Sequence, residues 1–203
     1  MRESGVGRVL VASLHQAIGD VMPTRLGFYE NWLTSEGLRE GTIGLAPLYA
    51  VLSFLRQEGA PYDAVVRAAG VYAAEWTVQS MGPARRRFIA RLPRFARRRI
   101  VLGRARQLVR DSFDGNRASW GIRKGTARFE VTGSVFCEVR ERVATPLCGY
   151  YAAACARMLA LFDLDVPVAI ASCRGSDADA TRCTLTVPFT APVAESSHET
   201  EPA

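Results

Sequence analysis

The chain has 203 residues, of which 48% are hydrophobic and 23% are charged. This composition supports a folded domain with a sizeable core and argues against intrinsic disorder. No stretch approaches the roughly 20 apolar residues that a membrane-spanning helix needs. The apolar segment near the N-terminus is interrupted by His15, Gln16 and Asp20, so we expect an amphipathic helix there, no signal peptide, and a cytoplasmic protein.

The first half of the chain is predicted to be helical, because apolar residues recur with the period of an amphipathic helix. Residues 7–20 form the first such segment, and the pattern returns in 25–38, where Gly37 is expected to end the helix. Residues 43–59 are almost entirely apolar until the last turn, which predicts a central helix covered on all sides. Residues 61–81 predict a fourth helix.

Residues 84–110 carry eleven arginines and no acidic residue, so the net charge of +6 is concentrated there. We expect one or two helices, divided at Pro93. The arginines are compatible with a solvated helix face, with recognition of anionic groups, or with nucleic acid. No DNA-binding motif accompanies them, so nucleic acid is not expected as a partner. The candidate anion-binding residues are Arg94, Arg97 and Arg98.

Apolar residues on the same segment also allow peripheral contact with a membrane surface. They are Phe88, Ile89, Leu92 and Phe95.

The pattern changes at residues 114–116. Residues 117–136 alternate between apolar and polar, which predicts a hairpin with its turn at Lys124 and Gly125. Residues 145–164 predict a helix capped by Thr145. Residues 166–173 and 182–189 predict a second pair of strands, and the polar, acidic tail 190–203 is predicted to be disordered. The fold class is therefore α+β: a helical N-terminal half followed by hairpin, helix and hairpin, within one domain of residues 1–189.

Three cysteines are predicted to meet at one corner of this fold. Cys148 begins the long helix, Cys173 ends one strand and Cys183 begins the next. Structural zinc takes four Cys or His ligands in a tetrahedron, and a helix N-terminus would lower the pKa of Cys148. The fourth ligand would be Cys137 or Glu138. The spacing matches no common zinc motif, so burial of the thiols in the core is the competing interpretation.

The segments around these cysteines resemble a known family. The order of a hairpin, PLCGYYAAA (146–154), a strand ending in CRGS (173–176) and CTL (183–185) is similar to the 4-vinyl reductase domain, a bacterial relative of TRAPP vesicle-tethering subunits. The resemblance covers roughly residues 117–189, and the helical first half agrees in order. In phenol-sensing relatives three cysteines and an upstream acidic residue hold zinc, which implies a structural Zn²⁺ here. The loop between the last two cysteines is longer than usual and lacks the family's second glycine.

The resemblance also implies a TRAPP-like antiparallel sheet packed on helices, with an apolar cavity for phenols, acyl chains or tetrapyrroles. Aromatic residues of this chain are candidates for its walls, although aromatic residues at helical spacing also fill cores. The candidates are Tyr49, Phe54, Tyr72, Trp76, Trp120, Phe136, Tyr150, Tyr151 and Phe162.

Catalysis has little support in the sequence. The two histidines, His15 and His198, offer almost no material for a nucleophilic triad, and no phosphate loop or dinucleotide fingerprint is present. We therefore expect a binding protein rather than an enzyme: a zinc-stabilised carrier or sensor of an apolar or tetrapyrrole-like molecule. The alternatives are a TRAPP-like dimeric interaction module without ligand and an accessory protein of bacteriochlorophyll synthesis. A homodimer is expected.

Overall fold

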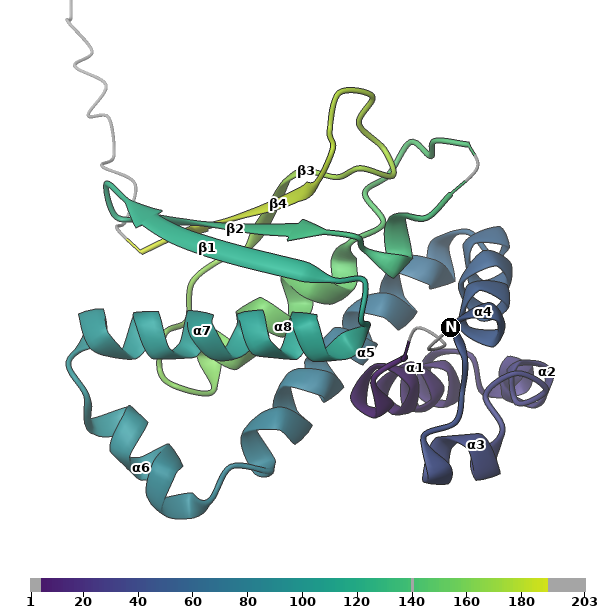
Figure 1. Cartoon of the computed structure of the whole chain (residues 1–203), viewed down its shortest axis with the longest axis horizontal. Coiled ribbons are helices and arrows are strands. Elements are labelled where there is room, and N and C mark those ends of the chain that lie inside the picture. The colour runs from purple at the N-terminus through teal and green to yellow at the C-terminus, as the bar shows by residue number, and fades with distance from the viewer. Residues whose placement is uncertain (1–4, 140, 190–203) are drawn as a thin grey trace, which may run out of the picture.

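Helices and a four-stranded antiparallel sheet form separate layers of the structure, a computed structural model that describes residues 5–139 and 141–189 (Figure 1). Helices α7 and α8 lie beneath the sheet, α5 packs on α8, and α1 packs on α5. The predicted α+β fold, with its helical first half, is confirmed. Within the described residues, no helix is both long and apolar enough to cross a bilayer. The tail 190–203, which the sequence predicts to be disordered, lies outside the described residues.

Residues 5–80 contain five α-helices: α1 (Arg8–Val21), α2 (Leu26–Tyr29), α3 (Ser35–Glu40), α4 (Leu45–Gln57) and α5 (Ala60–Gln79). A 3-10 turn, η1 (Pro23–Arg25), leads into α2. In α1 the apolar stripe that predicted the helix faces the core, since Leu10, Leu14 and Ile18 are buried.

The prediction of one helix over residues 25–38 is wrong. The chain leaves the helix after α2 and begins α3 at a new cap, where the Thr34 hydroxyl accepts a hydrogen bond from the Gly37 N–H at 3.1 Å. Gly37 is buried inside α3 and does not end it. The end is at Gly41, whose φ of 71° suits a left-handed C-terminal cap.

Helix α4 is not covered on all sides as predicted. Leu48, Val51 and Leu55 are buried, whereas Ser53 and Gln57 are exposed. The physical reason is that α4 lies at the edge of the helical layer, so only one of its faces meets neighbouring helices (Figure 1).

The arginine-rich segment forms two helices, α6 (Pro83–Arg91) and α7 (Arg94–Ser112), which are separated at Leu92 and Pro93 as predicted. Helix α7 runs beneath strand β1, whereas α6 projects away from the body of the molecule (Figure 1). Ile89 is 2% exposed and anchors α6.

The sheet has the strand order β1-β2-β4-β3. Strands β1 (Arg117–Arg123) and β2 (Thr126–Thr132) form the first predicted hairpin, whose two-residue turn places Lys124 and Gly125 at positive φ. Strands β3 (Ala169–Ser172) and β4 (Cys183–Pro188) form the second. Phe129 of β2 pairs with Leu185 of β4, and both are fully buried against the helices.

Helix α8 (Gly149–Ala160) is shorter than the predicted helix over residues 145–164, and its N-terminal cap is Cys148 rather than Thr145. Helices α5 and α8 approach very closely at Gly70, where a Cβ would collide with the Tyr150 carbonyl oxygen. This close packing fixes the position of Cys148 relative to the sheet.

Candidate metal centre and adjoining cleft

Four cysteines from four different elements come together in the structure. Cys137 ends the 3-10 turn η2 (Val135–Cys137), Cys148 caps α8, Cys173 follows β3, and Cys183 begins β4. The β3–β4 hairpin brings its two cysteines together, and α8 brings its N-terminal cap to the same corner. All four Sγ atoms lie within 4.8 Å of one another, and all four residues are buried. The predicted convergence of Cys148, Cys173 and Cys183 is confirmed.

The spacing of the sulfur atoms suits a tetrahedral metal ion. The Cys137 Sγ lies 3.5 Å from that of Cys173 and 3.3 Å from that of Cys183, and the Cys173 and Cys183 Sγ atoms are 3.9 Å apart. Zn–S bonds of about 2.3 Å arranged as a tetrahedron separate the sulfur atoms by about 3.8 Å. Four buried thiols at this spacing could hold a metal ion after shifts of only a fraction of an ångström to about one ångström.

The protein backbone also supports a charged sulfur at this site. The Leu147 N–H donates a hydrogen bond to the Cys173 Sγ at 3.3 Å. The Leu147 carbonyl in turn accepts one from the Tyr62 hydroxyl at 3.1 Å, which connects the site to α5. A thiolate that accepts N–H donors is stabilised in its charged form.

Contacts among the thiols move their pKa values in opposite directions. Hydrogen bonds from Cys137, Cys148 and Cys183 lower the pKa of Cys173. Hydrogen bonding with Cys137 is the main cause of the raised pKa of Cys148, and also of Cys183.

The structure also decides between the two candidates for the fourth position. Cys137 belongs to the cluster, whereas the Glu138 carboxylate faces the surface and accepts a hydrogen bond from Arg174 at 2.7 Å. Cys155 is buried on α8 outside the cluster, and burial raises its pKa to about 12. Cys155 is therefore a core residue, as predicted.

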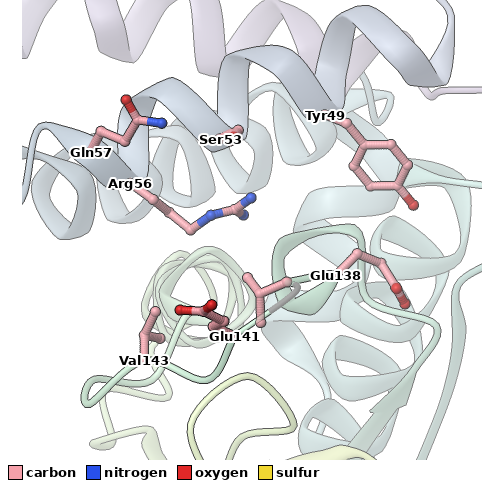
Figure 2. Close-up of a pocket in the computed structure, with 8 residues that line it drawn as sticks. Tyr49, Ser53, Arg56, Gln57, Glu138, Glu141 and Val143 are labelled. Atoms are coloured by element: carbon pink, nitrogen blue, oxygen red, sulfur yellow. The ribbon is translucent and has the colours of Figure 1, made fainter.

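A cleft of about 900 Å³ lies next to the cysteine cluster, between α4 and the segment that follows Cys137. Figure 2 shows Tyr49 and Arg56 extending from α4 towards Glu138, Glu141 and Val143 on the opposite wall. A second cleft of about 510 Å³ shares Arg56 and Val143 with the first and continues along α5 to Leu147 and Ile170. Both volumes fall in the range typical of small-molecule sites.

Arg56 is the central polar group of this pair of clefts. Its Nη1 donates a long hydrogen bond of 3.5 Å to the carbonyl oxygen of Phe136, the residue before Cys137. Burial, followed by the charge of Glu138, raises the pKa of Tyr49. Of the cleft residues, only Tyr49 was a predicted ligand contact. Two features of the sequence could have indicated the other cleft residues. One is Arg56, the lone arginine of the apolar segment 43–59, and the other is the pair of acids Glu138 and Glu141, three residues apart.

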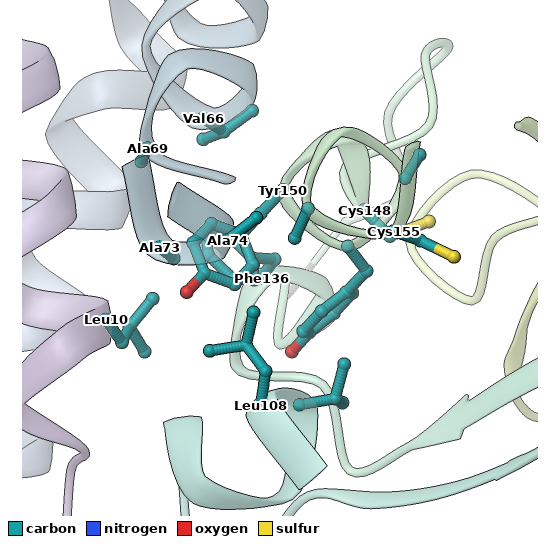
Figure 3. Packing of buried hydrophobic residues seen from close by; sticks show 14 of the residues in the cluster. Leu10, Val66, Ala69, Ala73, Ala74, Leu108, Phe136, Cys148, Tyr150 and Cys155 are labelled. Atoms are coloured by element: carbon teal, nitrogen blue, oxygen red, sulfur yellow. The ribbon is translucent and has the colours of Figure 1, made fainter. Parts of the chain in front are cut away.

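The predicted aromatic residues do not share one cavity. Phe136, Tyr150 and Tyr151 are fully buried and pack on one another, with ring centroids 5.0 to 5.5 Å apart. Figure 3 shows Phe136 and Tyr150 among the buried residues of the core. They fill the core between α5, α8 and η2. Phe162 is likewise buried. Burial is the main cause of the raised pKa values of both tyrosines, and it raises the pKa of Tyr150 to about 12.

The remaining candidates lie apart from these three. Trp120 is half-buried on β1, and Phe54 packs against Trp32. Tyr72 stacks on Trp76 and donates a 2.6 Å hydrogen bond to Asp20, which lowers the pKa of that carboxyl. Trp76 lines a separate cleft of about 810 Å³ between α1, α5 and α7.

The three candidate anion-binding arginines lie within the first turns of α7, and two of them contact other parts of the chain. Arg97 donates a hydrogen bond to the Ala90 carbonyl and forms an ion pair with Asp163. The Arg98 guanidinium lies over the Phe189 ring and donates a hydrogen bond to the backbone carbonyl of Phe189. Burial, followed by the charge of Arg94, lowers the pKa of Arg98. Arg94 is exposed. Arg97 and Arg98 therefore already contact other parts of the chain, and the anion site proposed for this trio stays a prediction from the sequence.

In comparisons with known proteins, no family model and no curated protein matches the chain.

Proposed function

We propose that the protein is a zinc-stabilised binding domain that acts as a carrier or sensor of a small molecule. The observation that carries this proposal is the cluster of four buried Sγ atoms at a spacing close to that of a tetrahedral site. Four thiolates favour zinc among the divalent metals available to proteins. Four protein ligands leave no open position for water, so the metal would be structural rather than catalytic.

The metal and the clefts are connected through the chain. Residues from 138–139 and 141–147 line one wall of the clefts, and in the sequence they lie between two of the cluster residues, Cys137 and Cys148. A metal bound by both cysteines would anchor the two ends of this wall. Metal binding would therefore organise the clefts, although it takes no part in binding the ligand directly.

The walls of the clefts indicate the class of ligand. Glu138 and Glu141 line the 900 Å³ cleft and do not line the 510 Å³ cleft. In the 510 Å³ cleft Val143, Leu147 and Ile170 offer an apolar surface, and Arg56 offers a half-buried guanidinium. We propose an apolar or aromatic molecule with a carboxylate, a class that includes phenolic acids, acyl chains and tetrapyrroles. The relationship to the 4-vinyl reductase family, the homodimer and the TRAPP-like interaction module stay predictions from the sequence.

Metal analysis tests the proposal directly. Mass spectrometry of the purified protein should find about one zinc per chain, and Cys173→Ser should lose most of it. Cys155→Ser is the matched control, since it removes a buried thiol outside the cluster, and it should keep its zinc. Purified protein with no metal and five freely titrating thiols would contradict the proposal.

A fluorescent apolar anion, anilinonaphthalene sulfonate, tests the cleft. Arg56→Gln should weaken its binding about tenfold, as expected for loss of one charge-assisted contact. Arg39→Gln removes an exposed arginine outside the cleft and should leave binding unchanged. Equal affinity in wild type and Arg56→Gln would place the probe elsewhere.

A further inference from the structure

The two most exposed large apolar side chains in the described part of the chain lie close together in sequence. Phe88 on α6 is 62% exposed and Phe95 at the start of α7 is 69% exposed. They flank the bend at Leu92 and Pro93, on the corner that projects from the body of the molecule (Figure 1). Isolated exposed apolar residues are normal on proteins, but two exposed phenylalanines on a projecting corner indicate a contact surface.

Exposed arginines surround these phenylalanines. Arg85 and Arg91 stand three residues before and after Phe88, a spacing that places them on the same side of α6. Arg87 and Arg94 are also exposed. Among residues 5–139 and 141–189, no ion pair engages any of the four. We call Arg85, Arg87, Phe88, Arg91, Arg94 and Phe95 the arginine–phenylalanine patch.

We propose that the arginine–phenylalanine patch docks the protein on an anionic lipid bilayer surface. Phenylalanines on a basic helix insert at the boundary between headgroups and acyl chains, while the arginines contact the lipid phosphates. Buried Ile89 and the hydrogen bond from Arg97 to the Ala90 carbonyl hold α6 against α7, so the patch is presented on a supported element. The contact is peripheral, made by side chains at the corner and by no membrane-spanning helix.

The charge of the patch argues against the other occupants. In a symmetric dimer formed through this corner, the arginines of one copy would face those of the other, because a two-fold contact places the same surface on both sides. No acidic residue lies between positions 84 and 110 to compensate. Sequence readout of nucleic acid uses Asn, Gln, Ser and Thr beside Arg, and residues 84–106 contain none of these four.

Vesicle co-sedimentation of the full chain tests the proposal. The protein should bind vesicles of phosphatidylcholine with phosphatidylglycerol and should bind vesicles of phosphatidylcholine alone much less. Each arginine near an anionic surface contributes a factor of about five to binding. The quadruple variant Arg85→Gln, Arg87→Gln, Arg91→Gln, Arg94→Gln should therefore lose well over tenfold in affinity, and the double variant Phe88→Ser, Phe95→Ser about tenfold.

Matched controls separate the patch from net charge and general stickiness. The quadruple control Arg39→Gln, Arg117→Gln, Arg123→Gln, Lys124→Gln removes the same charge elsewhere, and Val21→Ser removes an exposed apolar residue elsewhere; both should retain binding. Circular dichroism checks that each variant is folded.

Three results would overturn the proposal: no binding of the wild type to anionic vesicles, equal losses in the patch and control variants, or tighter binding of a single-stranded oligonucleotide than of vesicles.

Discussion

Removing the proposed zinc should lower the thermal stability of the protein by a predictable amount. The four Sγ atoms already stand 3.3 to 4.8 Å apart, near the tetrahedral spacing, so the folded chain presents an almost complete site. A metal that binds this state and not the unfolded chain stabilises it by mass action. At free zinc about 100 times the dissociation constant the gain is about 2.7 kcal/mol. For a chain of this length each kcal/mol moves Tm by about 2 to 4 °C, so chelation should lower Tm by about 5 to 11 °C.

The assay is a thermal unfolding scan of the protein as isolated, after chelation, and after zinc is restored. Zinc should restore Tm in the wild type and have little effect in Cys173→Ser. Cys155→Ser should show the same chelation-dependent difference as the wild type, even if its own Tm is lower, because Cys155 lies outside the cluster.

A protein that is shown to contain zinc, and whose Tm is unchanged by complete removal of that zinc, would refute this reasoning. The cluster would then not couple the metal to the folded state. A Cys155→Ser variant that loses the chelation effect would refute the assignment of the four ligands.

Three further predictions follow from local features of the fold. Gly70→Ala should destabilise the protein by about 1 to 3 kcal/mol, because the new Cβ would collide with the Tyr150 carbonyl. Gly103→Ala, which adds a Cβ in open space on a helix, should stabilise it by up to about 1 kcal/mol. Equal effects of the two variants in urea unfolding would contradict the close packing of α5 and α8. Burial as the first cause raises the pKa of Tyr29 to about 12 and that of Tyr150 to about 12, so stability should be full below pH 10 and fall as the pH rises towards 12. Tyrosinate absorbance from these residues should therefore appear together with loss of circular dichroism, and its appearance in the folded protein near pH 10 would contradict their burial. Lys124→Asn should stabilise the first hairpin by about 0.5 kcal/mol, since Lys124 has a φ of 47° and Asn tolerates that region better, and an unchanged urea midpoint would count against this.

Local sequence patterns were sufficient where a segment's own chemistry decides its structure. The alternation in residues 117–136 predicted the first hairpin, and Lys124 and Gly125 predicted its turn, because a two-residue turn between strands requires positive φ. The same reasoning failed for residues 25–38, where Thr34 offers a cap that restarts the helix. Apolar content alone also overstated the burial of α4, since periodicity cannot say whether a second neighbour covers the far face.

The candidate metal centre shows both sides of this division. The positions of Cys148, Cys173 and Cys183 at element boundaries were readable from the sequence, and so was the expectation that they meet. The sequence could not show that Cys137 rather than Glu138 completes the cluster. Adjacent residues point in different directions, and the backbone after η2 determines which of the two turns inward.

The sequence by itself determined a helical first half followed by hairpin, helix and hairpin, the concentration of arginines in residues 84–110, and the placement of three thiols where a hairpin and a helix begin or end. Only the tertiary structure decided which aromatic residues fill the core, which arginines are engaged by the chain, and that Arg56 lines the same cleft as Glu138 and Glu141. The physical reason is that secondary structure follows from neighbours along the chain, whereas burial, clefts and ligand sites follow from contacts between segments far apart in it.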